Sequence, residues 1–175
     1  MRQAELVRYL ILAAQREGNR RLTRELSAAG VTPAQSEVLR ILGDYAPLSL
    51  TGLGALLVSE SGTSPSRLVD RLVDTGLVER AVDSGDRRQV TLTLTGPGST
   101  AEAAVREVED RLYRDLDGAL TGLDLGPLID VLRMLSAGEL AGNAVQNRLS
   151  TPMTHPGSAA RPTPARPTPA TGGPQ

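Results

Sequence analysis

The chain has 175 residues, 39% of them hydrophobic, and a formal net charge of −1, which fits one globular domain with an appendage or two small domains. It contains no Cys and a single His, His155, so disulfides and thiolate metal sites are excluded and most histidine-based catalysis is removed. The apolar run 9–14 is too short to span a bilayer, and no signal-peptide pattern surrounds it. We therefore expect a soluble, cytoplasmic protein that has no membrane segment and needs no metal or cofactor.

Three helices are predicted in the first third of the chain. Apolar residues recur on one face of the segment 2–28, which predicts a first helix. Thr32 is an N-cap residue followed by a proline at the first helical position and by Gln35 at the capping-box position, so a second helix should start there. Pro47 breaks that helix, and Ser49 can cap a short third helix.

A fourth helix, with one entirely polar face, is predicted over residues 65–75. It begins with a proline in its first turn and is followed by Gly76, a residue suited to the left-handed C′ position. On a helical wheel, the face opposite the apolar stripe carries only Ser64, Arg67, Asp70, Arg71, Asp74 and Thr75. This polar face is either a solvated surface with ion pairs three residues apart or a surface that reads DNA.

Two strands and a turn between them are predicted to follow this helix. Residues 77–82 form the first strand, 83–86 have turn chemistry, and 90–95 alternate Val or Leu with Thr, as in a half-buried strand. A two-stranded β-wing with arginines beside its tip is suited to contact a DNA backbone and its grooves. The charge balance counts against this interpretation, because residues 60–95 hold five Arg against six acidic residues.

The predicted fold class is mainly α with a two-stranded β-wing, that is, a winged helix-turn-helix flanked by dimerisation helices. An N-terminal helix at 1–30 and a long and a last helix at 98–149 are too apolar to stand alone, so we expect them to form a dimerisation region. The winged helix-turn-helix should occupy 31–97. Residues 150–175 hold seven of the twelve prolines and should form a disordered tail, either inert or partner-binding.

The second predicted strand completes a spaced motif of Asp86, any residue, Arg88, five residues, and then Leu94-Thr95. This is the wing signature of the MarR family of transcriptional regulators, which the chain resembles over about residues 5–148. The resemblance implies a homodimer that binds double-stranded DNA and represses, less often activates, neighbouring genes. It also implies release from DNA by a small effector, commonly aromatic or phenolic.

The polar helix face and the family resemblance together predict the DNA contacts. Arg67 lies one turn into the helix, where a guanidinium can meet the two acceptors of guanine. Ser64 and Ser66 lie at the helix N-terminus, where hydroxyl and N–H groups suit phosphate. Arg71 points the same way as Arg67, one turn later.

The wing is predicted to add a minor-groove contact and a structural ion pair. The family resemblance sends an arginine of the wing into the minor groove, and we expect this to be Arg87. Arg88 should be held by a carboxylate, either Asp70 or Asp86, which would fix the wing. Arg80, at the base of the wing, is expected to contact the DNA backbone.

Candidates for an effector site are few. A pocket should lie between the dimerisation helices and the winged region, and Tyr9, Arg16 and Tyr45 are the polar or aromatic residues that could line it. The alternative, which we favour for each of them, is an ordinary packing or surface residue.

Two other classes of function remain to be weighed. A winged-helix module that binds protein without reading DNA sequence is the alternative, because the charge is balanced. An enzyme is not expected, because the chain lacks Cys, a glycine-rich phosphate loop and a suitably spaced carboxylate pair.

Overall fold

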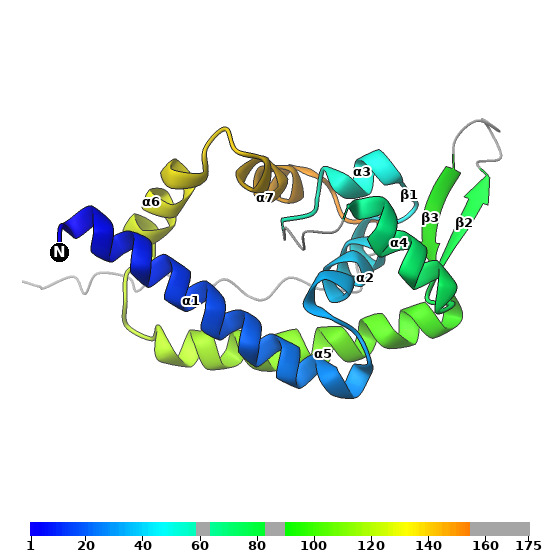
Figure 1. The fold of residues 1–175 in the computed structure, drawn as a ribbon, viewed down its shortest axis with the longest axis horizontal. Coiled ribbons are helices and arrows are strands. Elements are labelled where there is room, and N and C mark those ends of the chain that lie inside the picture. Colours follow the sequence, from blue (N-terminus) through cyan, green and yellow to red (C-terminus); the bar gives the residue numbers. More distant parts are fainter. Residues whose placement is uncertain (59–63, 83–89, 155–175) are drawn as a thin grey trace, which may run out of the picture.

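The structure, a computed structural model, describes residues 1–58, 64–82 and 90–154. Its elements in chain order are α1 (Gln3–Leu26), the 3-10 helix η1 (Ser27–Ala29), α2 (Pro33–Tyr45), β1 (Leu48–Ser49), α3 (Leu50–Gly54), α4 (Pro65–Asp74), β2 (Val78–Val82), β3 (Val90–Leu94), α5 (Gly96–Ala119), α6 (Gly126–Ser136) and α7 (Leu140–Ser150). Figure 1 shows an elongated molecule, with the sheet and α4 at one end and α6 and the start of α1 at the other. The predicted fold class, mainly helical with a β-wing, is confirmed.

The N-terminal helix signals are confirmed as local hydrogen bonds. The Gln35 amide donates to the Thr32 hydroxyl at 3.3 Å, and the Thr32 amide donates to the Gln35 side chain at 2.9 Å, which completes the capping box. The Ser49 hydroxyl accepts a hydrogen bond from the Gly52 amide at 3.0 Å and so caps α3. The first helix ends at Leu26, slightly earlier than predicted, and one 3-10 turn follows it.

The end of α4 is fixed by the glycine that the sequence pointed to. Gly76 has φ +72°, a left-handed conformation that favours glycine. Its amide donates to the Val73 carbonyl and the Leu77 amide donates to the Leu72 carbonyl, each at 2.9 Å. These two bonds form a Schellman motif, which turns the chain directly into β2.

The sheet has three antiparallel strands, in the order β1-β3-β2, where the sequence predicted two. The additional strand is only two residues long, and Leu48 pairs with Leu92 of β3. Such a segment is too short to show the alternation that identifies a strand in sequence. It ties the chain before α3 to the base of the wing.

The C-terminal region forms two helices after α5 where one was predicted. Gly138 lies between α6 and α7 with φ +81° and breaks the apolar pattern that made the two segments look continuous. A Cβ on Gly142 would lie 2.0 Å from the Ser136 carbonyl oxygen, so the two helices approach closely there. This approach turns α7 away from α6.

The core is aliphatic and lies under the winged part of the molecule. Leu39, Leu53, Leu72, Leu92 and Val105 are each at most 2% exposed and join α2, α3, α4, the sheet and the first half of α5. By contrast, α6 buries no residue in the single chain. Within the described ranges, no helix combines the length and the apolar character that crossing a membrane requires.

Candidate nucleic-acid interface

One face of α4 packs into the core and the other is open. Leu68, Val69 and Leu72 are buried, which fixes the rotation of the helix about its axis. Arg67 and Arg71 are therefore exposed on the opposite face, as are the other residues predicted to form it: Ser64, Asp70, Asp74 and Thr75. The predicted polar face is thus a real exposed surface beside the sheet.

The N-terminus of α4 presents two hydroxyl groups. Ser64 occupies the N-cap position without bonding a helix amide through its side chain. Its hydroxyl lies 3.0 Å from that of Ser66, which is half-buried. The helix N-terminus thus offers hydroxyl and N–H donors together, a combination that suits a phosphate group.

An ion pair joins Asp70 of α4 to Arg80 of β2. The Arg80 guanidinium donates to the Asp70 carboxylate at 2.5 Å, and about half of each side chain is exposed. Arg80 is therefore paired in the single chain, while 44% of its side chain stays exposed. Two predicted wing arginines and one predicted carboxylate, Arg87, Arg88 and Asp86, lie outside the described residues.

The predicted solvated ion pairs along α4 are not formed in the described part of the chain. Asp70 pairs with Arg80 rather than with Arg67, and Arg71 has no carboxylate of α4 within ion-pair distance. Neither Arg67 nor Arg71 therefore forms an ion pair with Asp70 or Asp74.

The threonine of the wing motif holds three elements together. The Thr95 hydroxyl donates to the Gly76 carbonyl at 2.6 Å and accepts from the Gly98 amide at 3.0 Å. Its amide donates to the Leu77 carbonyl at 3.1 Å. Thr95 therefore joins the end of α4, the start of β2 and the start of α5. The spaced motif includes this threonine, but its structural role is visible only in the fold.

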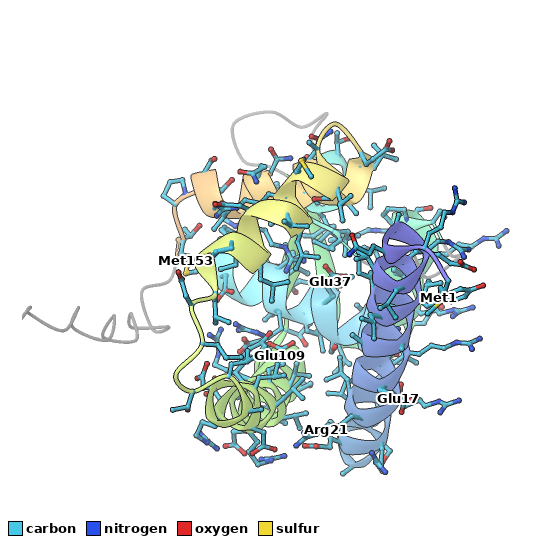
Figure 2. All side chains as sticks on the ribbon, turned by 90° about the vertical axis from the view of Figure 1, so that its left-hand side faces the viewer. Met1, Glu17, Arg21, Glu37, Glu109 and Met153 are labelled. Carbon is cyan, nitrogen blue, oxygen red and sulfur yellow. The ribbon has the colours of Figure 1, made fainter. Side chains whose placement is uncertain are left out.

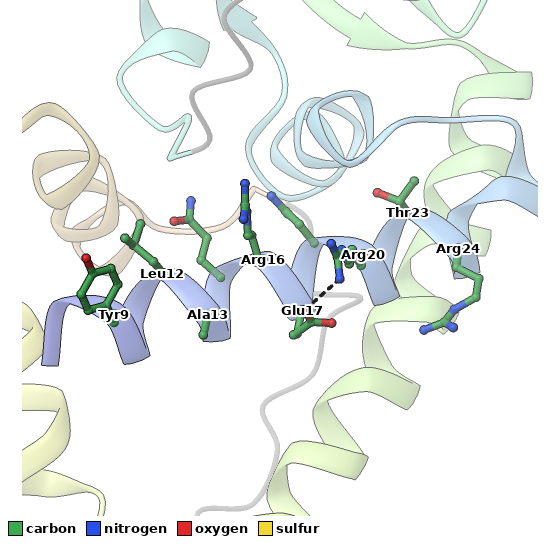
Figure 3. A pocket seen from close by; sticks show the side chains of 10 residues that line it. Tyr9, Leu12, Ala13, Arg16, Glu17, Arg20, Thr23 and Arg24 are labelled. Carbon is green, nitrogen blue, oxygen red and sulfur yellow. Dashed lines mark hydrogen bonds and ion pairs between the residues drawn. The ribbon is translucent and has the colours of Figure 1, made fainter. Parts of the chain in front are cut away.

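The three effector candidates do not come together. Tyr9 and Arg16 lie on the same side of α1, beside a groove of about 1050 Å³ whose lining, among the described residues, comes from α1 (Figure 3). Tyr45 lies elsewhere: it is 7% exposed, and its hydroxyl donates to the Arg148 carbonyl at 3.2 Å. Tyr45 is a packing residue in this chain and lies apart from the groove beside Tyr9, because α2 turns it inward.

A cluster of charged side chains, which the sequence did not predict, links α2 to α5. Arg40 binds Glu102 at 2.5 Å and Glu109 at 3.0 Å, and Arg106 binds Asp44 at 2.9 Å and Glu102 at 2.6 Å. We call these five residues the α2–α5 ion cluster. Burial raises the pKa of Glu109, and the charge of Arg40 acts against that rise.

A helix-turn-helix with an arginine-bearing open face, followed by a β-wing, defines a winged helix-turn-helix DNA-binding protein. The sequence model of the MarR family matches residues 29–89. A protein of Thauera aromatica, a proposed transcriptional regulatory protein for the hcr operon, is 30% identical over 124 residues, which are 71% of this chain and 72% of the relative. The chain belongs to the MarR family, whose members are transcriptional regulators and not enzymes.

Solved structures of similar proteins agree with this fold. A cysteine-to-serine mutant of Escherichia coli MarR in complex with operator DNA has a TM-score of 0.63 and 29% identity, with 73% of this chain and 91% of that chain covered. The Staphylococcus aureus MepR–DNA complex has a TM-score of 0.66 and 22% identity, with 75% and 96% covered. The organohalide-sensing regulator RdhR, bound to 2,4-dichlorophenol, has a TM-score of 0.66 and 21% identity, with 80% and 83% covered.

Proposed function

We propose that the chain is a homodimeric repressor that binds a near-palindromic operator through two copies of α4. The observation that carries this proposal is the open face of α4, which exposes Arg67 in a MarR-family chain. In a two-fold dimer the two recognition helices enter successive major grooves, so the half-sites should lie about 10 bp apart. Arg67 reads a base edge, while Ser64 and Ser66 contact phosphate.

The homodimer is supported by apolar surface that the single chain leaves uncovered. On α1 and α6, between 39% and 69% of the surface stays exposed for Leu6, Val7, Tyr9, Leu10, Ile11, Leu12, Leu128, Ile129, Val131, Leu132, Met134 and Leu135. Val7 and Ile11 of α1 share an apolar hollow with Leu135 of α6, so the two faces form one patch. A second copy that covers this patch would remove it from water.

Selection of DNA by the purified protein from a random pool tests the proposal. We expect a palindromic consensus and two protomers bound per selected duplex, as measured by mobility shift and light scattering. Recovery of no consensus, with a monomer in solution, would contradict the operator and the dimer together. It would favour the alternative, a winged-helix module that binds protein.

Replacing Arg67 by alanine should weaken binding to the selected duplex by about 1–3 kcal/mol, because a bidentate contact to guanine is lost. The preference should relax at one base pair per half-site, as read from duplexes with single substitutions. Arg114→Ala, which removes an exposed arginine from the far half of α5, is the matched control and should leave both quantities unchanged. Unchanged discrimination in Arg67→Ala would remove Arg67 from base readout.

We further propose that a small aromatic molecule releases the operator by favouring a half-site spacing that misfits the DNA. The groove beside Tyr9 and Arg16 offers an aromatic face and a cation, and the structurally similar RdhR binds 2,4-dichlorophenol. Titration of simple phenols into the protein–operator complex tests this step, and a complex that no phenol weakens would contradict it.

A further inference from the structure

The last helix, α7, docks on the helix-turn-helix of its own chain. Ala144 is 2% exposed, and the side chains that follow it reach α2 and the segment after α3. Figure 1 shows α7 between α6 and α3, with the sheet on the far side of α3. Although α7 touches the end of α6 near Gly142, the apolar side chains of α6 remain exposed.

Two side chains of α7 bond the carbonyls of Ala55, the C-cap residue of α3, and of Leu56, the residue after it. The last carbonyls of a helix have no donor within the helix, and α3 is only five residues long. Asn147 donates from its side-chain amide to the Ala55 carbonyl at 2.9 Å, and the Arg148 guanidinium donates to the Leu56 carbonyl at 2.7 Å. The C-terminal end of α3 is thus capped from a segment more than ninety residues away.

Glu37 of α2 completes this junction. Its carboxylate accepts a hydrogen bond from the Val58 amide at 2.8 Å and also pairs with the Arg148 guanidinium. The Glu37 side chain is 13% exposed and that of Arg148 is 32% exposed, so the carboxylate is the more buried partner of the pair. In Figure 2, Glu37 lies between the ribbon of α2 and the C-terminal helices.

A second set of contacts anchors the end of α7 to the end of α2. The Tyr45 hydroxyl donates to the Arg148 carbonyl, and the Thr154 amide donates to the Asp44 carbonyl at 2.8 Å. Arg148 is therefore held through its backbone while its side chain holds the segment 55–58.

We propose that α7 is a clamp on the helix-turn-helix and that Arg148 is a positioning residue for DNA binding. The clamped segment 55–58 is the chain that leads from α3 towards α4, so its position affects how the N-terminus of α4 meets DNA. Arg148 acts through this segment and does not touch DNA. The proposal rests on the proposed function in one respect, namely that α4 reads the operator.

The first arm of the test uses the free protein. In Arg148→Met, hydrogen–deuterium exchange of peptides that cover 55–58 should be about tenfold faster, because a charge-assisted hydrogen-bond set is lost. Arg133→Met, at an exposed position of α6, is the matched control and should leave this exchange unchanged. Equal exchange in wild type and Arg148→Met would overturn the clamp.

The second arm measures binding to the duplex selected by the wild-type protein and to a scrambled duplex of the same composition. In Arg148→Met we expect about tenfold weaker binding to the selected duplex, with the scrambled duplex and the salt slope unchanged, because no phosphate contact is removed. A salt slope reduced by about one would place Arg148 on a phosphate and overturn its positioning role. Unchanged affinity for the selected duplex would overturn it as well.

The two proposals fail in different ways. A wild-type protein without any preferred duplex would overturn the proposed function. The clamp would then be tested by the hydrogen–deuterium exchange of residues 55–58 in the free protein alone. If Arg148→Met does not fold, the same two measurements are made on Asn147→Ala. This variant removes the side-chain hydrogen bond to the Ala55 carbonyl.

Discussion

Replacing Gly98 by alanine is expected to cost about 3 kcal/mol of folding free energy, the upper part of the range for forcing extra atoms into a packed site. A Cβ at this position would lie 1.8 Å from the Leu77 carbonyl oxygen and 2.8 Å from its carbon. Both are backbone atoms, so a rotamer change cannot relieve the clash. Urea unfolding at fixed protein concentration measures the loss.

The same substitution should also weaken operator binding. The Leu77 carbonyl accepts the Thr95 amide, and Thr95 in turn holds the carbonyl of Gly76, so a displaced Leu77 moves the end of α4 and the base of the wing together. Gly96→Ala is the matched control, because a Cβ there meets nothing within 4 Å. Equal unfolding midpoints for the two variants would show that the junction adapts and that its close packing is unimportant.

Local signals in the sequence were sufficient for most helices and for the wing. The capping box at Thr32, the left-handed glycine at Gly76 and the alternation in β3 each depend on residues within a few positions of one another. The polar face of α4 followed from the same periodicity, because the buried Leu72 and its neighbours fix which side is open. These features could be predicted without knowledge of the tertiary structure.

Features that depend on distant partners could not be predicted. Strand β1 forms because Leu48 pairs with Leu92, which lies forty-four residues later in the sequence. A strand of two residues has no pattern of its own that predicts it. Arg148 looks like any arginine near a helix C-terminus until α7 is placed against the carbonyls after α3. Asp70 was one of two carboxylates expected to hold an arginine of the wing, and the ion pair that the structure shows there, with Arg80, depends on how β2 lies against α4.

The inward position of Tyr45 illustrates the same limit. A tyrosine in a helix can present its ring to a pocket or pack it with only the hydroxyl bonded, and composition does not distinguish the two. Here the ring is buried and the hydroxyl meets the end of α7. The exposed polar face of α4 could therefore be predicted from the sequence, because it follows from helical periodicity, whereas a pocket such as the proposed effector site depends on tertiary contacts.

Replacing Arg40 by methionine should be as damaging as the change at Gly98. The α2–α5 ion cluster would keep Asp44, Glu102 and Glu109 but only one guanidinium, that of Arg106, so carboxylates would be left in a largely buried site. Removal of one partner from a buried ion pair costs about 3–5 kcal/mol, and the lower value is expected here because Arg40 is 19% exposed. Urea unfolding measures this loss at pH 7.

The loss should depend on pH in a defined direction. Burial raises the pKa of Glu109, and removal of Arg40 would raise it further. A carboxyl with a raised pKa in the folded state stabilises that state fully below its unfolded pKa, and this contribution is lost as pH rises through the folded pKa. The deficit of Arg40→Met relative to wild type should therefore be largest near neutral pH and shrink below about pH 5.

A matched surface substitution separates this effect from the general loss of an arginine. Arg20 pairs with Glu17 at 3.0 Å, but both side chains are about 70% exposed, so Arg20→Met should cost at most about 0.5 kcal/mol and show no such pH dependence. If both variants lose the same stability at every pH, then the α2–α5 ion cluster behaves as a solvated surface network. The link between α2 and α5 would then rest on the apolar contacts of Val105 and its neighbours alone.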